Sequence, residues 1–241
     1  MPSPNIFFSG GGNSKQSGIL DRVFARTVGR SGRILYIPIA MPLTNRTYGQ
    51  CFDWFTKTAS KQGLTKVDMW TDLSGRSLPE LNKYQAVYIG GGNTFYLMDS
   101  IRRTGFYKQL KAYIKGGGIV YGGSAGAIVL GKDIRTAQFG NFSDKNNVGL
   151  KNLEGFDLLN GLSIKCHYKS DNDTQIMKHL KHKKTNVLAL PEETGVQLSG
   201  KNVKIIGYKD AYLFTNGKKI RLTKNSEFDI FRAANRLFTQ K

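Results

Sequence analysis

Cysteine is scarce in this sequence, which contains only Cys51 and Cys166 among 241 residues. Two cysteines so far apart do not form a disulfide framework, and there is no CxxC pair to hold zinc. We therefore expect both thiols to be reduced and structural. Nothing in the residue pattern requires a metal ion or an organic cofactor, so none is expected.

Long apolar runs are also missing. No segment approaches the roughly 20 apolar residues that cross a bilayer, and the start, MPSPNIFFSGGG, lacks the basic and apolar regions of a leader peptide. We therefore expect a cytoplasmic enzyme with no membrane association. With 39% hydrophobic residues, a chain of this length can bury one large core, which predicts a single α/β domain over residues 1–241.

Acidic residues are few, because 17 Asp and Glu stand against 36 Lys and Arg, for a formal net charge of +19. Such a charge attracts polyanions at low salt and makes an acidic substrate plausible on electrostatic grounds. However, the basic residues are scattered, with the densest runs at 178–184 and 218–224, and no zinc finger, basic zipper or RNP-like motif accompanies them. Solvated lysine faces are the favoured interpretation, and a nucleic-acid partner is not expected.

Short apolar runs alternate with helical patterns along the chain, which is typical of a largely parallel sheet covered on both faces. Between residues 212 and 222, Asn-Gly separates two alternating runs and predicts a hairpin. The pattern from Ser226 to Phe238 predicts a closing amphipathic helix capped by Ser226. The remaining predicted strands are 5–10, 33–40, 66–70, 86–91, 118–123, 162–168, 187–193, 195–200 and 204–208, and the remaining predicted helices are 14–29, 46–62 and 94–115, the last with a break at Gly105.

Three glycine clusters each follow a predicted strand, and each would lie at the carboxyl edge of the sheet, where open α/β folds bind ligands. They are SGGGN (9–13), IGGGNT (89–94) and YGGSAGA (121–127). The third fits G-x-S-x-G, the nucleophile elbow, in which a tight strand-to-helix turn lifts a serine hydroxyl clear of the sheet. Ser124 is therefore the candidate nucleophile, although a packing turn or a phosphate-binding loop would also use such glycines.

A serine nucleophile needs a base, and a histidine base needs an acid that fixes its tautomer. Of the three histidines, His167 follows an apolar strand and is the favoured base, whereas His179 and His182 lie on a basic helix. Glu192 follows another predicted strand and is a candidate acid. From the residues alone, the competing acids remain open: Glu193, Asp133, Asp171 and Asp173.

The segments IGGGNTFYL, GGGIVYGGSAGAIVL and PEETGV, together with a histidine after an apolar strand, resemble the peptidase E and cyanophycinase family of serine peptidases. The resemblance implies a flavodoxin-like three-layer sandwich with a mostly parallel central sheet, related to class I glutamine amidotransferases. It assigns Ser124 as nucleophile, His167 as base, and the backbone amides of Gly92 and Ala125 as the oxyanion hole. It also implies a homodimer.

The sequence departs from peptidase E in two places, which concern the third triad member and the substrate specificity. Its third triad member is an aspartate shortly after a segment like IRTTND, whereas Ile134-Arg135-Thr136 is followed here by Ala137, Gln138 and Phe139. Cyanophycinase-like members use a glutamate in a turn that resembles residues 191–194, which points to Glu192. The arginine-bearing stretch that helps peptidase E bind an N-terminal aspartate is replaced by residues 170–180, without arginine, and this weighs against Asp-X specificity.

The sequence thus predicts a serine peptidase that hydrolyses small peptides through Ser124, His167 and Glu192. Two alternatives stay open. One is a non-catalytic protein on the same fold that binds a phosphate or nucleotide through its glycine loops. The other is an α/β-hydrolase esterase, whose order of serine, acid and histidine would require Asp133 or Asp157 as the acid.

Overall fold

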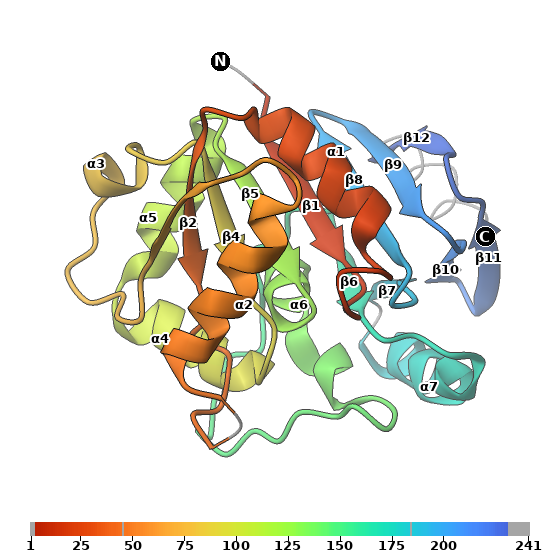
Figure 1. Ribbon diagram of the computed structural model, residues 1–241. Coiled ribbons are helices and arrows are strands. Elements are labelled where there is room, and N and C mark those ends of the chain that lie inside the picture. Colours follow the sequence, from red (N-terminus) through yellow and green to blue (C-terminus); the bar gives the residue numbers. More distant parts are fainter. Residues whose placement is uncertain (1–2, 45, 184, 231–241) are drawn as a thin grey trace.

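A central sheet with helices on both faces forms the framework of the molecule (Figure 1). The computed structural model describes residues 3–44, 46–183 and 185–230. In spatial order the strands of this sheet are β12 (Glu227–Asp229), β9 (Asn202–Gly207), β8 (Thr194–Ser199), β1 (Asn5–Ser9), β5 (Ile119–Gly123), β4 (Ala86–Ile89), β2 (Arg33–Ile37) and β3 (Lys66–Met69).

The core lies in two layers, one on each face of the sheet, because successive side chains of a strand point to opposite faces. On β1, Phe7 packs in the layer under α1 (Gly18–Val28) and α2 (Tyr48–Ser60), while Ile6 and Phe8 pack in the opposite layer. Covering both faces explains why these strands read as continuous apolar runs. The opposite layer is closed by α3 (Leu78–Leu81), α4 (Thr94–Arg103), α5 (Phe106–Lys115) and α6 (Ala125–Leu130).

Local signals set the helix ends. Thr47 and Gln50 form a reciprocal capping box at the start of α2, and the Asn93 side chain accepts from the Tyr96 amide at the start of α4. The predicted break at Gly105 is present, because this residue adopts a left-handed conformation (φ 75°) between α4 and α5. No helix in the described ranges is long and apolar enough to span a bilayer.

The central sheet is mixed, so the expectation of a largely parallel sheet holds for only part of it. Strands β1, β5, β4, β2 and β3 are parallel, whereas β8, β9 and β12 are antiparallel. For the pair β8 and β9, the reason is the length of the connection. Only Gly200 and Lys201 join β8 to β9, and a parallel pair needs a crossover of a dozen or more residues.

A second sheet is formed by segments that lie between strands of the central sheet along the chain. Its order is β11 (Lys218–Leu222), β10 (Ala211–Thr215), β7 (Asn186–Ala189) and β6 (Leu162–Lys165). The predicted hairpin is present between β10 and β11, where Asn216 and Gly217 both have positive φ. Between α6 and β7 lie two short 3-10 turns, Ile134–Gln138 and Ser170–Asn172, and helix α7 (Asp173–Lys183).

The predicted closing helix is wrong over its first residues. Glu227–Asp229 forms β12, which pairs with β9 while the amide of Ile205 donates to the Ser226 carbonyl at 2.9 Å. This tertiary pairing outweighs the local helical pattern. The rest of the predicted helix, from residue 231, lies outside the described residues.

Replacing Gly126 by alanine is expected to destabilise the fold by at least about 2 kcal/mol. A Cβ at this position would lie 2.3 Å from the backbone oxygen of Ile89, and the backbone of a central strand cannot move aside. Urea unfolding of Gly126→Ala checks this. Gly49→Ala on α2 is the matched control, since its nearest neighbour is 3.8 Å away. Gly49→Ala should unfold at or above the wild-type midpoint, because alanine favours a helix over glycine. If Gly126→Ala does the same, the contact with Ile89 does not exclude a Cβ.

Candidate active site

Ser124 occupies the sharp turn from β5 into α6 with φ 49° and ψ −109°, a conformation that costs a non-glycine residue of order 1–3 kcal/mol. The flanking glycines make the turn possible. A Cβ on Gly122 would lie 2.5 Å from the carbonyl group of Gly126, and one on Gly126 would meet the Ile89 carbonyl. The glycines therefore have the steric role that a nucleophile elbow requires.

His167 follows β6 and brings its ring to the serine. Its Nε2 lies 2.7 Å from Ser124 Oγ. Its backbone adopts φ 51°, and its amide donates to the Gly10 carbonyl at 2.8 Å. A Cβ on Gly11 would lie 2.2 Å from the imidazole Cε1, so the first glycine cluster packs directly against the ring. The ring is thus held from both the backbone and the neighbouring loop.

Glu192 contacts the other nitrogen of the ring, with Oε1 2.8 Å from His167 Nδ1. Because a carboxylate only accepts, Nδ1 carries the proton in this arrangement and Nε2 is free to accept from the serine hydroxyl. Burial alone would raise the pKa of Glu192, but hydrogen bonds from His167 and Gln16 outweigh it, so this pKa lies below its ordinary value.

Gln16 contacts Glu192, and the sequence analysis did not identify this residue. Its Nε2 donates to Glu192 Oε2 at 2.8 Å, while its Oε1 accepts from the Asn13 amide at 2.9 Å. The second bond fixes the orientation of the side-chain amide of Gln16, and hence the orientation of the Glu192 carboxylate. A glutamine in a loop after a glycine cluster carries no signal of this role, because its partner lies 176 residues further along the chain.

The competing acids have other partners. The Glu193 carboxylate pairs with Lys209 at 2.8 Å, and Asp133 pairs with Arg135. The Asp171 carboxylate accepts from Asn172, and that of Asp173 accepts from Tyr168 and Lys219. Asp157, an acid that the esterase alternative could use, pairs with Lys132 at 3.3 Å. The structure therefore brings Glu192, and none of these, into hydrogen-bond contact with His167.

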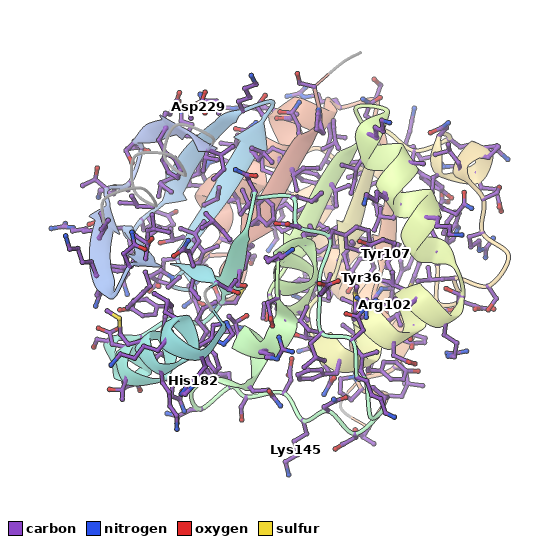
Figure 2. All side chains as sticks on the ribbon, turned by 180° about the vertical axis from the view of Figure 1, so that it is seen from behind. Tyr36, Arg102, Tyr107, Lys145, His182 and Asp229 are labelled. Carbon is purple, nitrogen blue, oxygen red and sulfur yellow. The ribbon has the colours of Figure 1, made fainter. Side chains whose placement is uncertain are left out.

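His179 and His182 lie on α7, apart from the serine. The ring of His179 packs edge-on against Phe139 with centroids 5.3 Å apart, and His182, labelled in Figure 2, is exposed on the same helix. Both cysteines are buried free thiols, and burial raises the pKa of Cys166 to about 12. A thiol with so high a pKa is not a competing nucleophile at neutral pH.

The two expected oxyanion donors belong to segments that lie next to the serine. Ala125 is the first residue of α6, where backbone amides have no intrahelical acceptor. Gly92 belongs to the loop after β4, which passes close to the serine, since a Cβ on Gly91 would lie 3.2 Å from Ser124 Cβ. The next amide in this loop, that of Asn93, donates to the Ala40 carbonyl at 2.7 Å and holds the loop in place.

A pocket of about 500 Å³ opens beside Ser124 and His167. Two charged groups that the sequence analysis did not select line this end of it. Lys165 is 3% exposed and donates to the Phe139 carbonyl at 2.9 Å, and burial lowers its pKa. The Asp144 carboxylate accepts from the Thr94 amide at 2.8 Å, and burial raises its pKa. Neither residue lies in a motif, so only the packing reveals them.

An α/β fold with a serine at a strand-to-helix elbow, hydrogen-bonded to a histidine, defines a serine hydrolase. The model of peptidase family S51 matches residues 6–206. The chain therefore belongs to peptidase family S51, and it is a serine-type peptidase.

Individual relatives agree with this family. An uncharacterized peptidase of Listeria monocytogenes is 28% identical over 141 aligned residues, and the match covers 57% of this chain and 68% of that protein. Peptidase E of Pasteurella multocida is 28% identical over 162 residues, covering 62% of this chain and 66% of the relative. The chain thus spans about two thirds of the length of these relatives.

A solved structure shows the same fold. The crystal structure of a peptidase from an acI-B1 Actinobacterium superposes with a TM-score of 0.70 at 18% identity, covering 95% of this chain and 97% of the other. A structure from Listeria monocytogenes superposes with a TM-score of 0.68 at 22% identity and covers 86% of this chain. The central sheet and its helices are therefore shared with these proteins.

Proposed function

We propose that this peptidase hydrolyses small peptides by acyl transfer through Ser124, His167 and Glu192. The observation that carries the proposal is the continuous line of hydrogen bonds from Ser124 Oγ through the imidazole to Glu192, at 2.7 and 2.8 Å. Each bond has the donor and acceptor that a nucleophile, a base and an orienting acid need.

In the first half of the reaction, Ser124 Oγ attacks the carbonyl carbon of the scissile bond while its proton passes to His167 Nε2. The imidazolium that forms is stabilised by Glu192. The oxygen of the tetrahedral intermediate accepts from the amides of Gly92 and Ala125. The intermediate collapses when Nε2 gives its proton to the leaving amine, which departs and leaves an acyl-serine.

In the second half, water attacks the acyl-serine and gives its proton to His167 Nε2. The second tetrahedral intermediate uses the same two amides. Its collapse releases the acid product and returns the proton to Ser124 Oγ. Every proton transfer runs through one nitrogen, which explains why the tautomer set by Glu192 matters.

The order of the parallel strands supports the flavodoxin-like part of the fold prediction. When strands are counted from β2, the neighbouring strands β3, β2, β4 and β5 stand in the order 2-1-3-4. Flavodoxin-like sheets begin with this order. The nucleophile follows β5, at the carboxyl edge where such sheets bind ligands.

Labelling with a fluorophosphonate tests the proposal first, because it needs no knowledge of the substrate. We expect the wild-type protein to be labelled on Ser124, as located by peptide mass spectrometry, and to lose its activity in step. A panel of dipeptides with varied residues, including β-linked aspartate, then identifies the substrate. Labelling elsewhere with full retention of peptidase activity would contradict the assignment of Ser124.

A further inference from the structure

The loop between β1 and α1, residues 10–17, contacts both the base and the acid of the proposed triad. Its Gly10 carbonyl accepts from the His167 amide at 2.8 Å. Its Gln16 side chain donates from Nε2 to Glu192 Oε2 at 2.8 Å. Although the loop lies near the start of the chain, it therefore touches both residues that act on the nucleophile.

Gln16 is held in this loop by reciprocal hydrogen bonds with Asn13. The Asn13 amide donates to Gln16 Oε1 at 2.9 Å, and the Gln16 backbone amide donates to Asn13 Oδ1 at 3.2 Å. This is the bonding pattern of a capping box, formed in the turn that precedes α1. Because Oε1 is used inside the turn, Nε2 is the atom that reaches Glu192. The turn thus orders the glutamine, which reduces the entropy cost of its bond to the carboxylate.

Both oxygens of the Glu192 carboxylate have a partner. Oε1 lies 2.8 Å from His167 Nδ1, and Oε2 accepts from Gln16. The terminal torsion of a glutamate has a broad minimum, so a single partner would leave the plane of the carboxylate free to turn. A Cβ on Gly12 would lie 2.9 Å from Gln16 Oε1 and 3.0 Å from Glu192 Cβ, so both side chains also pack against the loop backbone. Hydrogen bonding and packing together fix the acid.

The two contacts of the Gln16 side chain require one atom that accepts and one that donates, which an amide supplies and a carboxylate does not. A glutamate at position 16 would keep the bond from Asn13, because capping boxes commonly use glutamate. It would, however, face Glu192 with a second negative charge in place of a donor. Gln16→Glu therefore separates the role of the side chain in the turn from its contact with the acid.

Gln16 is not among the described residues that line the pocket beside Ser124. The loop lines that pocket through Gly11, Gly12, Ser14 and Ser17. We therefore expect changes at Gln16 to leave substrate binding, and hence KM, nearly unchanged. The route by which Gln16 reaches the reaction is its contact with Glu192.

We propose that Gln16 is a positioning residue of the reaction, which aligns the Glu192 carboxylate with His167 Nδ1 and thereby sets the rate of proton transfer from Ser124. This proposal rests on the proposed function, because the alignment affects the rate only if His167 is the base. An aligned carboxylate keeps the proton on Nδ1 and stabilises the imidazolium that forms as the serine attacks. Contacts that orient a metal ligand in the same indirect way change activity by about 10- to 100-fold, and we expect an effect of this size here.

Kinetics on the best dipeptide of the panel test the proposal. Gln16→Leu and Gln16→Glu should each lower kcat by about 10- to 100-fold and change KM by less than about 2-fold. Gln16→Glu should stay closer to the wild-type urea midpoint than Gln16→Leu, since it retains the bond from Asn13. In a protein that already carries Glu192→Ala, Gln16→Leu should change kcat by less than about 2-fold, because the acid on which it acts is gone.

Gln50 is the matched control, since it forms the same reciprocal pair with Thr47 at the start of α2 and is exposed. Gln50→Leu should lower the urea midpoint, as Gln16→Leu does, and leave kcat within about 2-fold of the wild-type value. Wild-type kcat in both Gln16 variants would overturn the proposal. A loss of the same size in Gln16→Leu with and without Glu192 would also overturn it, because Gln16 would then act by another route.

A second measurement does not depend on turnover. NMR spectra of protein with isotope-labelled histidine distinguish the two neutral tautomers of each imidazole, and the signals of His167 are those missing from His167→Gln. We expect the proton of His167 on Nδ1 in the wild type and a mixture of both tautomers in Gln16→Glu. If the tautomer shifts in this way but no peptide is cleaved, Gln16 positions the acid and the proposed function fails. If peptides are cleaved while neither kcat nor the tautomer responds to Gln16→Glu, the positioning role fails and the proposed function stands.

Discussion

Ser124→Ala is expected to lower kcat by roughly 10^4- to 10^6-fold while the protein remains folded. In the proposed mechanism the substitution removes the atom that attacks the carbonyl, and it leaves the pocket, the imidazole and the proposed oxyanion amides in place. The measurement is the hydrolysis rate on the best dipeptide of the panel, with unfolding followed in urea. Retention of a tenth or more of the wild-type rate by highly purified protein would rule out Ser124 as nucleophile.

Two further serine variants sharpen this test. Ser199→Ala, at the exposed end of β8, is the matched control and should leave the rate unchanged. Ser124→Gly should be as inactive as Ser124→Ala but more stable than it by about 1 kcal/mol or more, since glycine adopts φ 49° and ψ −109° with less strain. Equal unfolding midpoints for the alanine and glycine variants would show that the elbow is not strained.

Glu192→Gln is expected to lower kcat by about 10^3- to 10^4-fold with a much smaller change in KM. An amide at this position can donate to His167 Nδ1, which would favour the tautomer with the proton on Nε2. That nitrogen could then no longer accept the proton of Ser124. Steady-state kinetics on the same dipeptide measure the effect.

The neighbouring glutamate supplies the control. Glu193→Gln removes the same charge one residue away, where the carboxylate pairs with Lys209, and it should change kcat by less than about 2-fold. Equal losses in the two variants would show that charge near the pocket matters and that the contact between Glu192 and the imidazole does not.

The carboxylate of Glu192 also makes the stability of the folded protein depend on pH. Its pKa in the folded protein is lowered, so its contribution is present at neutral pH and is lost as the pH falls through the folded value, below the ordinary value of about 4.3. The difference in urea midpoint between wild type and Glu192→Gln should therefore be largest near neutrality and shrink in acid. A difference that grows in acid would contradict the lowered pKa.

Much of the site could be anticipated because its main signals are local. The spacing of Gly122, Ser124 and Gly126 reports a turn whose shape depends on those residues and their immediate neighbours. His167 was favoured because it follows an apolar strand, which is again a local pattern. The choice among the acids was different, because Glu192, Glu193 and three aspartates all had plausible positions along the chain.

In the fold, too, some features follow from local sequence and others depend on tertiary contacts. Strand and helix positions followed from periodicity, and the hairpin followed from Asn216 and Gly217. The prediction for the residues after Ser226 failed because Glu227–Asp229 pairs with β9, and such pairing can override a helical pattern.

The sequence by itself determined the strained elbow, the alternation of strands and helices, and the identity of a serine and a histidine suited to catalysis, because these depend on neighbouring residues. Tertiary structure alone decided which acid meets the imidazole and that Gln16 holds this acid. The physical reason is the separation of the partners, which are 25 residues apart for His167 and Glu192 and 176 for Gln16 and Glu192. Contacts at such separations exist only after the sheets and loops have packed.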